Sequence, residues 1–181
     1  AQVSVFERAG RYQLYVRSMQ EDGLGNLYLR FNELKQALER EGLFNAIHKK
    51  EIPSMPERLA ILSAKQGAAL QDVLRTLHQR YPLVARDIYP VPVQGRDAYQ
   101  VIVDTLKKVD EMGYSTILLV RGGGSIEDLW NFNEEALARC IYDLKTPIIT
   151  GVGHETDYTL VDYVSDLRAP TPTAAAVAAV P

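Results

Sequence analysis

From residue 58 onward, short apolar runs alternate with longer amphipathic segments. The apolar runs cover residues 59–62, 84–89, 116–120 and 147–152, and their length and composition are typical of buried strands. The helical spacing of apolar side chains predicts helices over residues 67–81, 96–112, 133–144 and 156–164. Because crossover helices join parallel strands, the pattern predicts an α/β fold, a mostly parallel sheet with helices on both faces.

Two further elements are expected before residue 58. Residues 3–6 and 12–16 are β-rich runs on either side of Gly10, which predicts a short antiparallel hairpin. Apolar side chains at i, i+4, i+7 and i+11 from Leu27 predict an amphipathic helix, which ends near Gly42.

These patterns divide the chain into four parts. Residues 1–22 are interpreted as the tail of a preceding β domain, and residues 23–57 as a connecting helix and linker. Residues 58–173 form the α/β domain, while the alanine-rich residues 174–181 are interpreted as the start of a truncated helical region. We therefore expect the chain to be a piece of a longer protein.

Composition and charge narrow the function. The 181 residues are 46% hydrophobic and 24% charged, which is typical of a globular protein with a real core. The sequence contains no apolar run of about 20 residues and no signal segment, and Cys140 has no partner for an intrachain disulfide, which together favour a cytoplasmic protein without a membrane partner. The net charge of −3 argues against nucleic-acid binding unless a local basic groove is present.

Three polar clusters follow predicted strands, where ligands bind in such folds. The first is the string Arg121, Gly122, Gly123, Gly124 and Ser125. Its glycines allow close approach to a ligand, backbone N–H groups at a helix start bind anions, and a guanidinium suits phosphate. It is not a P-loop, because no Gly-Lys-Ser/Thr follows. It is not a dinucleotide-binding fingerprint either, because Glu127 stands where the third glycine belongs. Anion binding and a simple strand-to-helix turn both remain open on spacing alone.

The second and third clusters supply proton-transfer and cationic groups. In the expected helix after residue 152, His154 and Asp157 are three residues apart and share a face, where the carboxylate orients the imidazole or both bind a metal. The alternative is a simple helix cap rich in acidic residues. The third cluster places Lys65 after the first strand and Asp72 in the following helix, although a lone helical Asp is usually a surface carboxylate.

Together the clusters suit an anionic phosphoester substrate. All three lie at strand ends of one predicted sheet, so they are expected to converge on a single crevice. The arrangement lacks the Ser-His-Asp or Cys-His pattern of acyl transfer, since Cys140 falls mid-helix on an apolar face.

Several strings in this order resemble the large subunit of exodeoxyribonuclease VII. They are SAKQGAA at residues 63–69 with Asp72, RGGGSIEDLWNFN at 121–133, VGHETD at 152–157 and DLRAPTP at 166–172. The resemblance implies degradation of single-stranded DNA from either end, in a complex with several copies of a small helical subunit. It also implies an N-terminal OB-fold, of which residues 1–22 would be a remnant.

The resemblance also assigns residue roles. The family's catalytic positions match Asp72, Arg121, His154 and Asp157, and phosphate contacts are expected from Lys65, from residues 122–125 and from Arg168. The activity implied need not depend on a divalent metal, so Mg²⁺ is not treated as a strict requirement and no metal ligands are assigned.

The expected mechanism is attack of water on a phosphodiester. Arg121 and the following N–H groups would stabilise charge on the non-bridging oxygens, and His154 would act as general base or general acid, oriented by Asp157. Asp72 would position water or a cation. Two alternatives are a non-catalytic single-strand DNA-binding module and a phosphoester hydrolase that acts on a small nucleotide.

Overall fold

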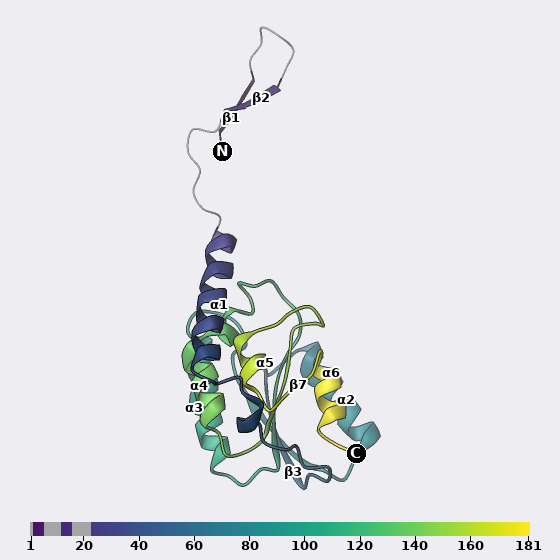
Figure 1. The fold of residues 1–181 in the computed structure, drawn as a ribbon. Coiled ribbons are helices and arrows are strands. Elements are labelled where there is room, and N and C mark those ends of the chain that lie inside the picture. The colour runs from purple at the N-terminus through teal and green to yellow at the C-terminus, as the bar shows by residue number, and fades with distance from the viewer. Residues whose placement is uncertain (1, 6–11, 16–22) are drawn as a thin grey trace.

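A five-stranded parallel sheet forms the centre of the molecule (Figure 1). The computed structural model describes residues 2–5, 12–15 and 23–181. The strands run in the order β4-β3-β5-β6-β7, where β3 is Arg58–Ser63, β4 is Ala85–Pro90, β5 is Thr116–Arg121, β6 is Ile148–Val152 and β7 is Leu167–Arg168. All four neighbouring pairs are parallel, which confirms the predicted α/β fold and its four strands. The short fifth strand, β7, was not predicted.

Helices cover both faces of this sheet (Figure 1). One face is covered by α2 (Ala68–Arg80) and α6 (Pro172–Ala178). The other is covered by α3 (Ala98–Asp110), α4 (Glu135–Asp143), α5 (Leu160–Val164) and the C-terminal half of α1 (Gly23–Arg40), with the 3₁₀ turns η1 (Ala46–His48) and η2 (Trp130–Asn133) between them. None of the helices among the described residues is long and apolar enough to cross a bilayer.

The central strand β5 shows why its sequence is apolar without alternation. Ile117 and Leu119 pack into the core beneath α3 and α4, whereas Leu118 and Val120 pack into the core beneath α2 and α6. Because a strand covered on both faces buries every side chain, it is a continuous apolar run. Arg121, the last residue of β5, breaks this run with a charge at the carboxyl edge of the sheet.

The strand order creates a switch point between β3 and β5. The chain leaves β3 toward β4 on one side, then crosses back to form β5 on the opposite side of β3. The connections after β3 and β5 therefore diverge to opposite faces, and a crevice opens at the carboxyl ends of these two strands.

The expected domain limits do not coincide with the ends of packed elements. Leu38 of α1 and Leu43 lie in the core that α3 and α4 cover, so part of the predicted linker packs against the sheet. At the other end, α6 begins before residue 174, and Ala175 and Ala176 are fully buried against the sheet and α2. Small side chains allow this close packing of α6 on β6.

The N-terminal strands β1 (Gln2–Val5) and β2 (Tyr12–Tyr15) pair antiparallel, with Gln2 opposite Tyr15. This agrees with the β-rich pattern of the sequence. The expected turn at Gly10 lies outside the described residues, and the assignment to an OB-fold remnant remains a prediction.

One predicted helix begins later than expected. The sequence predicted a helix from residue 156, but α5 starts at Leu160. Thr159 and Asp162 form a capping box that fixes the helix start there, with the Thr159 backbone N–H donating to the Asp162 carboxylate at 2.9 Å. Residues 154–157 therefore form a separate turn.

Candidate functional site

Arg121 is held at the switch point by neutral acceptors. Its guanidinium donates to the carbonyl oxygens of Gly122 at 3.1 Å and Gly123 at 2.8 Å, and it approaches the Gln94 side-chain oxygen at 3.4 Å. Only 8% of the residue is exposed. The loop after β5 thus folds back around the side chain that ends the strand.

The charge of this guanidinium has no counter-ion. No carboxylate among the described residues forms an ion pair with Arg121. A buried charge is costly without a partner, and the neutral carbonyls accept from one guanidinium nitrogen but leave the positive charge uncompensated. Because a guanidinium matches the geometry of phosphate, this position is suited to an anionic ligand.

His154 and Asp157 meet in the turn after β6. The two are in contact as expected, but the turn places them together, not the shared helical face that the sequence predicted. The Asp157 carboxylate accepts from the His154 backbone N–H at 2.9 Å and lies 3.6 Å from its Nδ1 atom. The His154 side chain is 72% exposed. A small rotation would give the hydrogen bond that orients an imidazole for proton transfer.

Gly123 brings the two loops into contact. A Cβ atom on Gly123 would overlap the His154 imidazole, so only glycine leaves room for the ring here. At Gly124 a Cβ would meet the Arg121 guanidinium. The glycines thus set the packing between the Arg121 loop and the His154 turn, and the two predicted clusters lie next to each other.

Gly122 and Ser125 belong to the same string, but their surroundings differ from those of Gly123 and Gly124. A Cβ on Gly122 would meet open space, and Gly122 is not among the glycines with positive φ. The Ser125 N–H and hydroxyl both donate to the Asp128 carboxylate, at 3.2 Å and 3.1 Å. A phosphate would therefore compete with Asp128 for the donors of Ser125.

Arg168 of β7 supports the His154 turn. One of its guanidinium nitrogens donates to the carbonyl oxygens of His154, Glu155 and Asp157 at 3.1–3.3 Å. The guanidinium also lies 3.8 Å from the ring centre of Tyr158. The predicted phosphate contact remains untested, but in this structure Arg168 holds the backbone of the turn.

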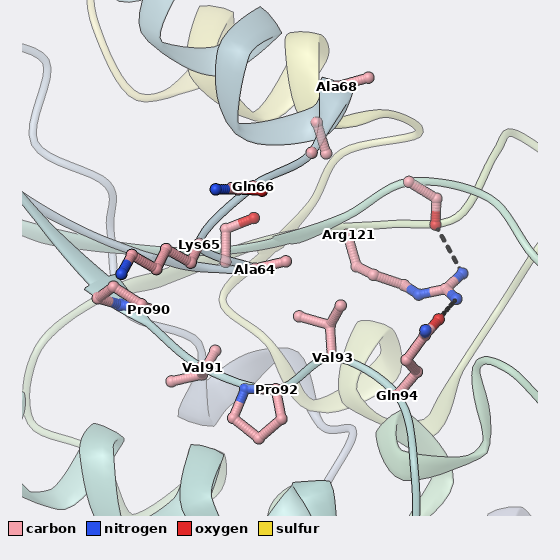
Figure 2. Close-up of a pocket in the computed structure, with 14 residues that line it drawn as sticks. Ala64, Lys65, Gln66, Ala68, Pro90, Val91, Pro92, Val93, Gln94 and Arg121 are labelled. Atoms are coloured by element: carbon pink, nitrogen blue, oxygen red, sulfur yellow. Dashed lines mark hydrogen bonds between the residues drawn. The ribbon is translucent and has the colours of Figure 1, made fainter.

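A cavity of about 640 Å³ opens at the switch point beside Arg121 (Figure 2). The loop after β3, including Lys65, forms one side, and the segment after β4, from Val91 to Gln94, forms another. Figure 2 shows the Arg121 guanidinium at one end beside Gln94, while the Lys65 side chain extends in the opposite direction. Lys65 and Arg121 therefore share this cavity but not one point within it.

Asp72 is a predicted site residue whose side chain pairs with a neighbour on its own helix. It lies in α2, outside the residues that line the cavity, and its carboxylate pairs with Arg75 at 3.4 Å. Its side chain is 46% exposed. The catalytic role of Asp72 stays a prediction that rests on resemblance.

Three residues that support the site carried little signal in the sequence. Gln94 contacts Arg121, Asn133 accepts from the Leu160 N–H at 2.9 Å, and Asp162 accepts from the Thr150 hydroxyl at 2.7 Å. Burial raises the pKa of Asp162, while hydrogen bonds from Thr159 and Thr150 oppose that rise. Each bridges segments that only the fold brings together, so spacing along the chain does not reveal them.

A further property of the site is whether its side chains could hold a metal ion. Within the described ranges, no three His, Cys, Asp or Glu side chains gather as a group that could hold a metal ion.

Fold and site together define a doubly wound α/β protein with a crevice at its switch point that Lys65 and Arg121 line. Comparison with known proteins identifies the family. The sequence profile described as "Exonuclease VII, large subunit" matches residues 43–181. Proteins named exodeoxyribonuclease 7 large subunit from Staphylococcus haemolyticus, Staphylococcus carnosus and Staphylococcus aureus are 53%, 52% and 52% identical over all 181 residues. The chain belongs to the exodeoxyribonuclease VII large-subunit family.

The chain spans 41% of the length of these relatives. The family assignment, which the sequence motifs had predicted, is confirmed over the whole chain.

Proposed function

We propose that this chain is the catalytic part of an exodeoxyribonuclease that hydrolyses phosphodiester bonds in single-stranded DNA. The observation that carries the proposal is the buried Arg121 at the switch point, which has no carboxylate partner among the described residues and whose loop contacts His154 through Gly123. The names of its relatives and its membership of the family support the same reaction.

Arg121 is proposed to stabilise the transition state. As water attacks phosphorus, negative charge grows on the non-bridging oxygens, and a fixed donor already aimed at that position needs no reorganisation. The carbonyls of Gly122 and Gly123 hold the guanidinium in place, and its remaining donors and its charge are directed to the substrate. Low exposure strengthens the interaction, because water screens it less.

His154 is proposed to transfer the proton, and Asp157 to orient it. The exposed imidazole can accept a proton from the attacking water or donate one to the leaving oxygen. The Asp157 carboxylate accepts from the His154 backbone N–H and lies close to Nδ1 of the same residue, so it can orient the imidazole after a small rotation. Asp72 keeps the proposed role of positioning water or a cation.

The wider assembly follows from family membership. We propose cleavage from either end of the strand, in a cytoplasmic complex with several copies of a small subunit, and turnover that does not strictly require Mg²⁺. Lys65 and the loop of residues 122–125 are proposed to contact phosphates on either side of the cleaved bond.

The experiment is a comparison of binding and turnover for His154→Ala in the full-length large subunit with its small subunit. We expect turnover of a labelled oligonucleotide to fall by about 10²-fold or more, as for loss of a general acid or base, with DNA affinity unchanged. His78→Ala is the matched control, because His78 is an exposed histidine on α2 away from the site.

Each alternative function predicts a different result. A non-catalytic binding module would leave turnover intact in His154→Ala. An enzyme for a small nucleotide would hydrolyse a mononucleotide ester well and show no preference for single-stranded DNA. Either result would contradict the proposal.

A further inference from the structure

The cavity at the switch point has an unusual charge composition. Of the fourteen residues that line it, two are cationic, Lys65 and Arg121, and none is acidic. The chain as a whole has 23 acidic and 20 basic residues. A cavity with this lining, in an acidic protein, favours an anionic ligand.

Most of the cavity wall is nevertheless apolar. Val91, Pro92 and Val93 form one side, and the opposite side includes Ala64 of the β3–α2 connection with Ala68 and Ala69 at the start of α2. Figure 2 shows the Val93 methyl groups pointing into the cavity between the two segments, and Ala64 facing the same space. Inorganic phosphate would leave this surface uncovered, so the ligand must carry an apolar body as well as negative charge.

Positive potential lies at two places on the cavity wall. The guanidinium of Arg121, a residue that is only 8% exposed, is at one end. The first turn of α2 is at another, where Gly67, Ala68 and Ala69 line the cavity and no side chain within the described part of the chain caps the helix start. Uncapped N–H groups and the helix dipole attract an anion there.

The polar side chains of the cavity can recognise any base. Gln66 and Gln94 line it, and an amide offers one acceptor and one two-proton donor group. Gln94 directs its oxygen to Arg121, which leaves its NH₂ group available. When such an amide rotates, it can hydrogen-bond to the edges of different bases, so the contact does not depend on the DNA sequence.

We propose that this cavity binds one nucleotide of the DNA strand next to the cleaved bond, an inference that rests on the proposed function. The scissile phosphate lies at Arg121, the base lies against Val93, and the next phosphate lies toward the first turn of α2 and Lys65. The volume of about 640 Å³ lies within the range of pockets that hold small organic ligands, about 300–1,000 Å³. The enzyme thus holds a base beside the reacting phosphate rather than the backbone alone.

The test uses the full-length large subunit with its small subunit and a series of labelled oligonucleotides. Each oligonucleotide has one abasic residue, and the abasic position moves along the strand. We expect the abasic residue to slow cleavage of the adjacent bond on one side by about tenfold or more, the effect of losing a buried apolar group, and to leave other bonds unaffected. Equal cleavage at every position would overturn the inference.

A variant then locates the effect in the cavity. Val93→Phe fills the space for the base, so it should slow cleavage of the intact strand but not of the abasic strand, and the two substrates should become alike. Ala64→Leu, which fills the same cavity from the opposite side, is the second variant if Val93→Phe does not assemble. Val101→Phe is the control, because Val101 is 45% exposed on α3 and outside the cavity lining.

The outcomes separate this inference from the proposed function. If the wild-type complex releases nothing from single-stranded DNA, the proposed function fails and the inference fails with it. If it cleaves the strand but Val93→Phe slows intact and abasic substrates by the same factor, the cavity does not hold the base, and the proposed function stands.

Discussion

Single glycines control how the two loops of the site approach each other. Gly123 leaves space for the His154 ring, and Gly124 leaves space for the Arg121 side chain. The substitution of any side chain at these positions must move a group that the mechanism uses. The glycine string therefore acts through packing between loops as much as through backbone freedom.

We expect Gly123→Ala to impair turnover much more than Gly122→Ala. The added methyl group at position 123 displaces the His154 imidazole, whereas at position 122 it enters open space at an ordinary φ. A misplacement of about 1 Å typically costs about 10²-fold in rate. Single-turnover cleavage by the two variants in the full complex measures the difference, and equal losses would show that the contact with His154 is irrelevant.

The sequence could not distinguish these glycines. It correctly indicated a loop of special geometry after a strand, because glycines in a row are typical of close approach. Which glycine matters depends on His154, about thirty positions along the chain, and on how β5 and β6 pair. For Asp72 the sequence already offered the alternative of a surface carboxylate, and its side chain is 46% exposed.

At the scale of elements, the turn after β6 depends on its neighbours for its shape. Arg168 bonds three of its carbonyls, and Asp162 holds the start of α5 directly after it. The exposed catalytic candidate His154 is thus mounted on a turn that is held from both sides.

Arg168→Ala is expected to lower turnover while leaving the salt dependence of DNA binding unchanged. The lost guanidinium releases the turn that carries His154, but in the structure it is engaged with carbonyls and not free for a phosphate. A residue that neutralises a phosphate would instead lower the slope of log K against log salt by about one. Binding titrations at several salt concentrations decide between these roles, and Arg168→Lys should recover part of the rate.

Asp162→Ala is expected to destabilise the chain by about 1–3 kcal/mol, because three buried hydrogen-bond donors of Thr150 and Thr159 lose their acceptor. Asp162→Asn should cost less, since the Thr150 hydroxyl can turn to accept from the new amide. Urea unfolding measures both changes.

The same residue makes a prediction for pH. Burial raises the pKa of Asp162, so the folded state binds the proton more tightly than the unfolded state. Its charge therefore costs stability at neutral pH, and this cost is relieved as pH falls through the raised folded pKa toward the unfolded value. Asp162→Asn should remove this contribution, and an unchanged pH profile of stability would contradict the assignment.

The elements themselves were largely predictable from the sequence. The four long strands and the helices between them follow from apolar runs and helical periodicity, because a buried parallel sheet imposes both. Strand β7 was missed since Leu167 and Arg168 alone show no periodicity, and their pairing depends on β6. The start of α5 was misplaced because two cap signals, at Asp157 and at Thr159, lie close together.

At the scale of the whole molecule, charge is unevenly distributed. The net charge is −3, yet the cavity at the switch point is lined by cations without acids. Total charge therefore does not describe the local charge of this cavity. What decides is the local arrangement, which the fold produces by bringing the ends of β3, β4 and β5 to one edge.

This distinction between distributed and local charge also separates binding from catalysis. A DNA strand contacts many phosphates, and one cation among them contributes a modest, salt-dependent share of affinity. Stabilisation of the transition state is local to one phosphorus and requires donors in fixed positions. Lysine at position 121 keeps the charge and loses the planar guanidinium, so it should serve the first role and fail in the second.

The most direct test of the account is Arg121→Lys in the full complex, by single-turnover cleavage of a labelled oligonucleotide beside a binding titration at the same salt. We predict a loss of about 10²–10³ in the saturated cleavage rate, as for removal of one aligned donor, with affinity changed only slightly. A variant that weakens binding but cleaves at the wild-type rate once saturated would make Arg121 a binding residue, and would contradict the proposed mechanism.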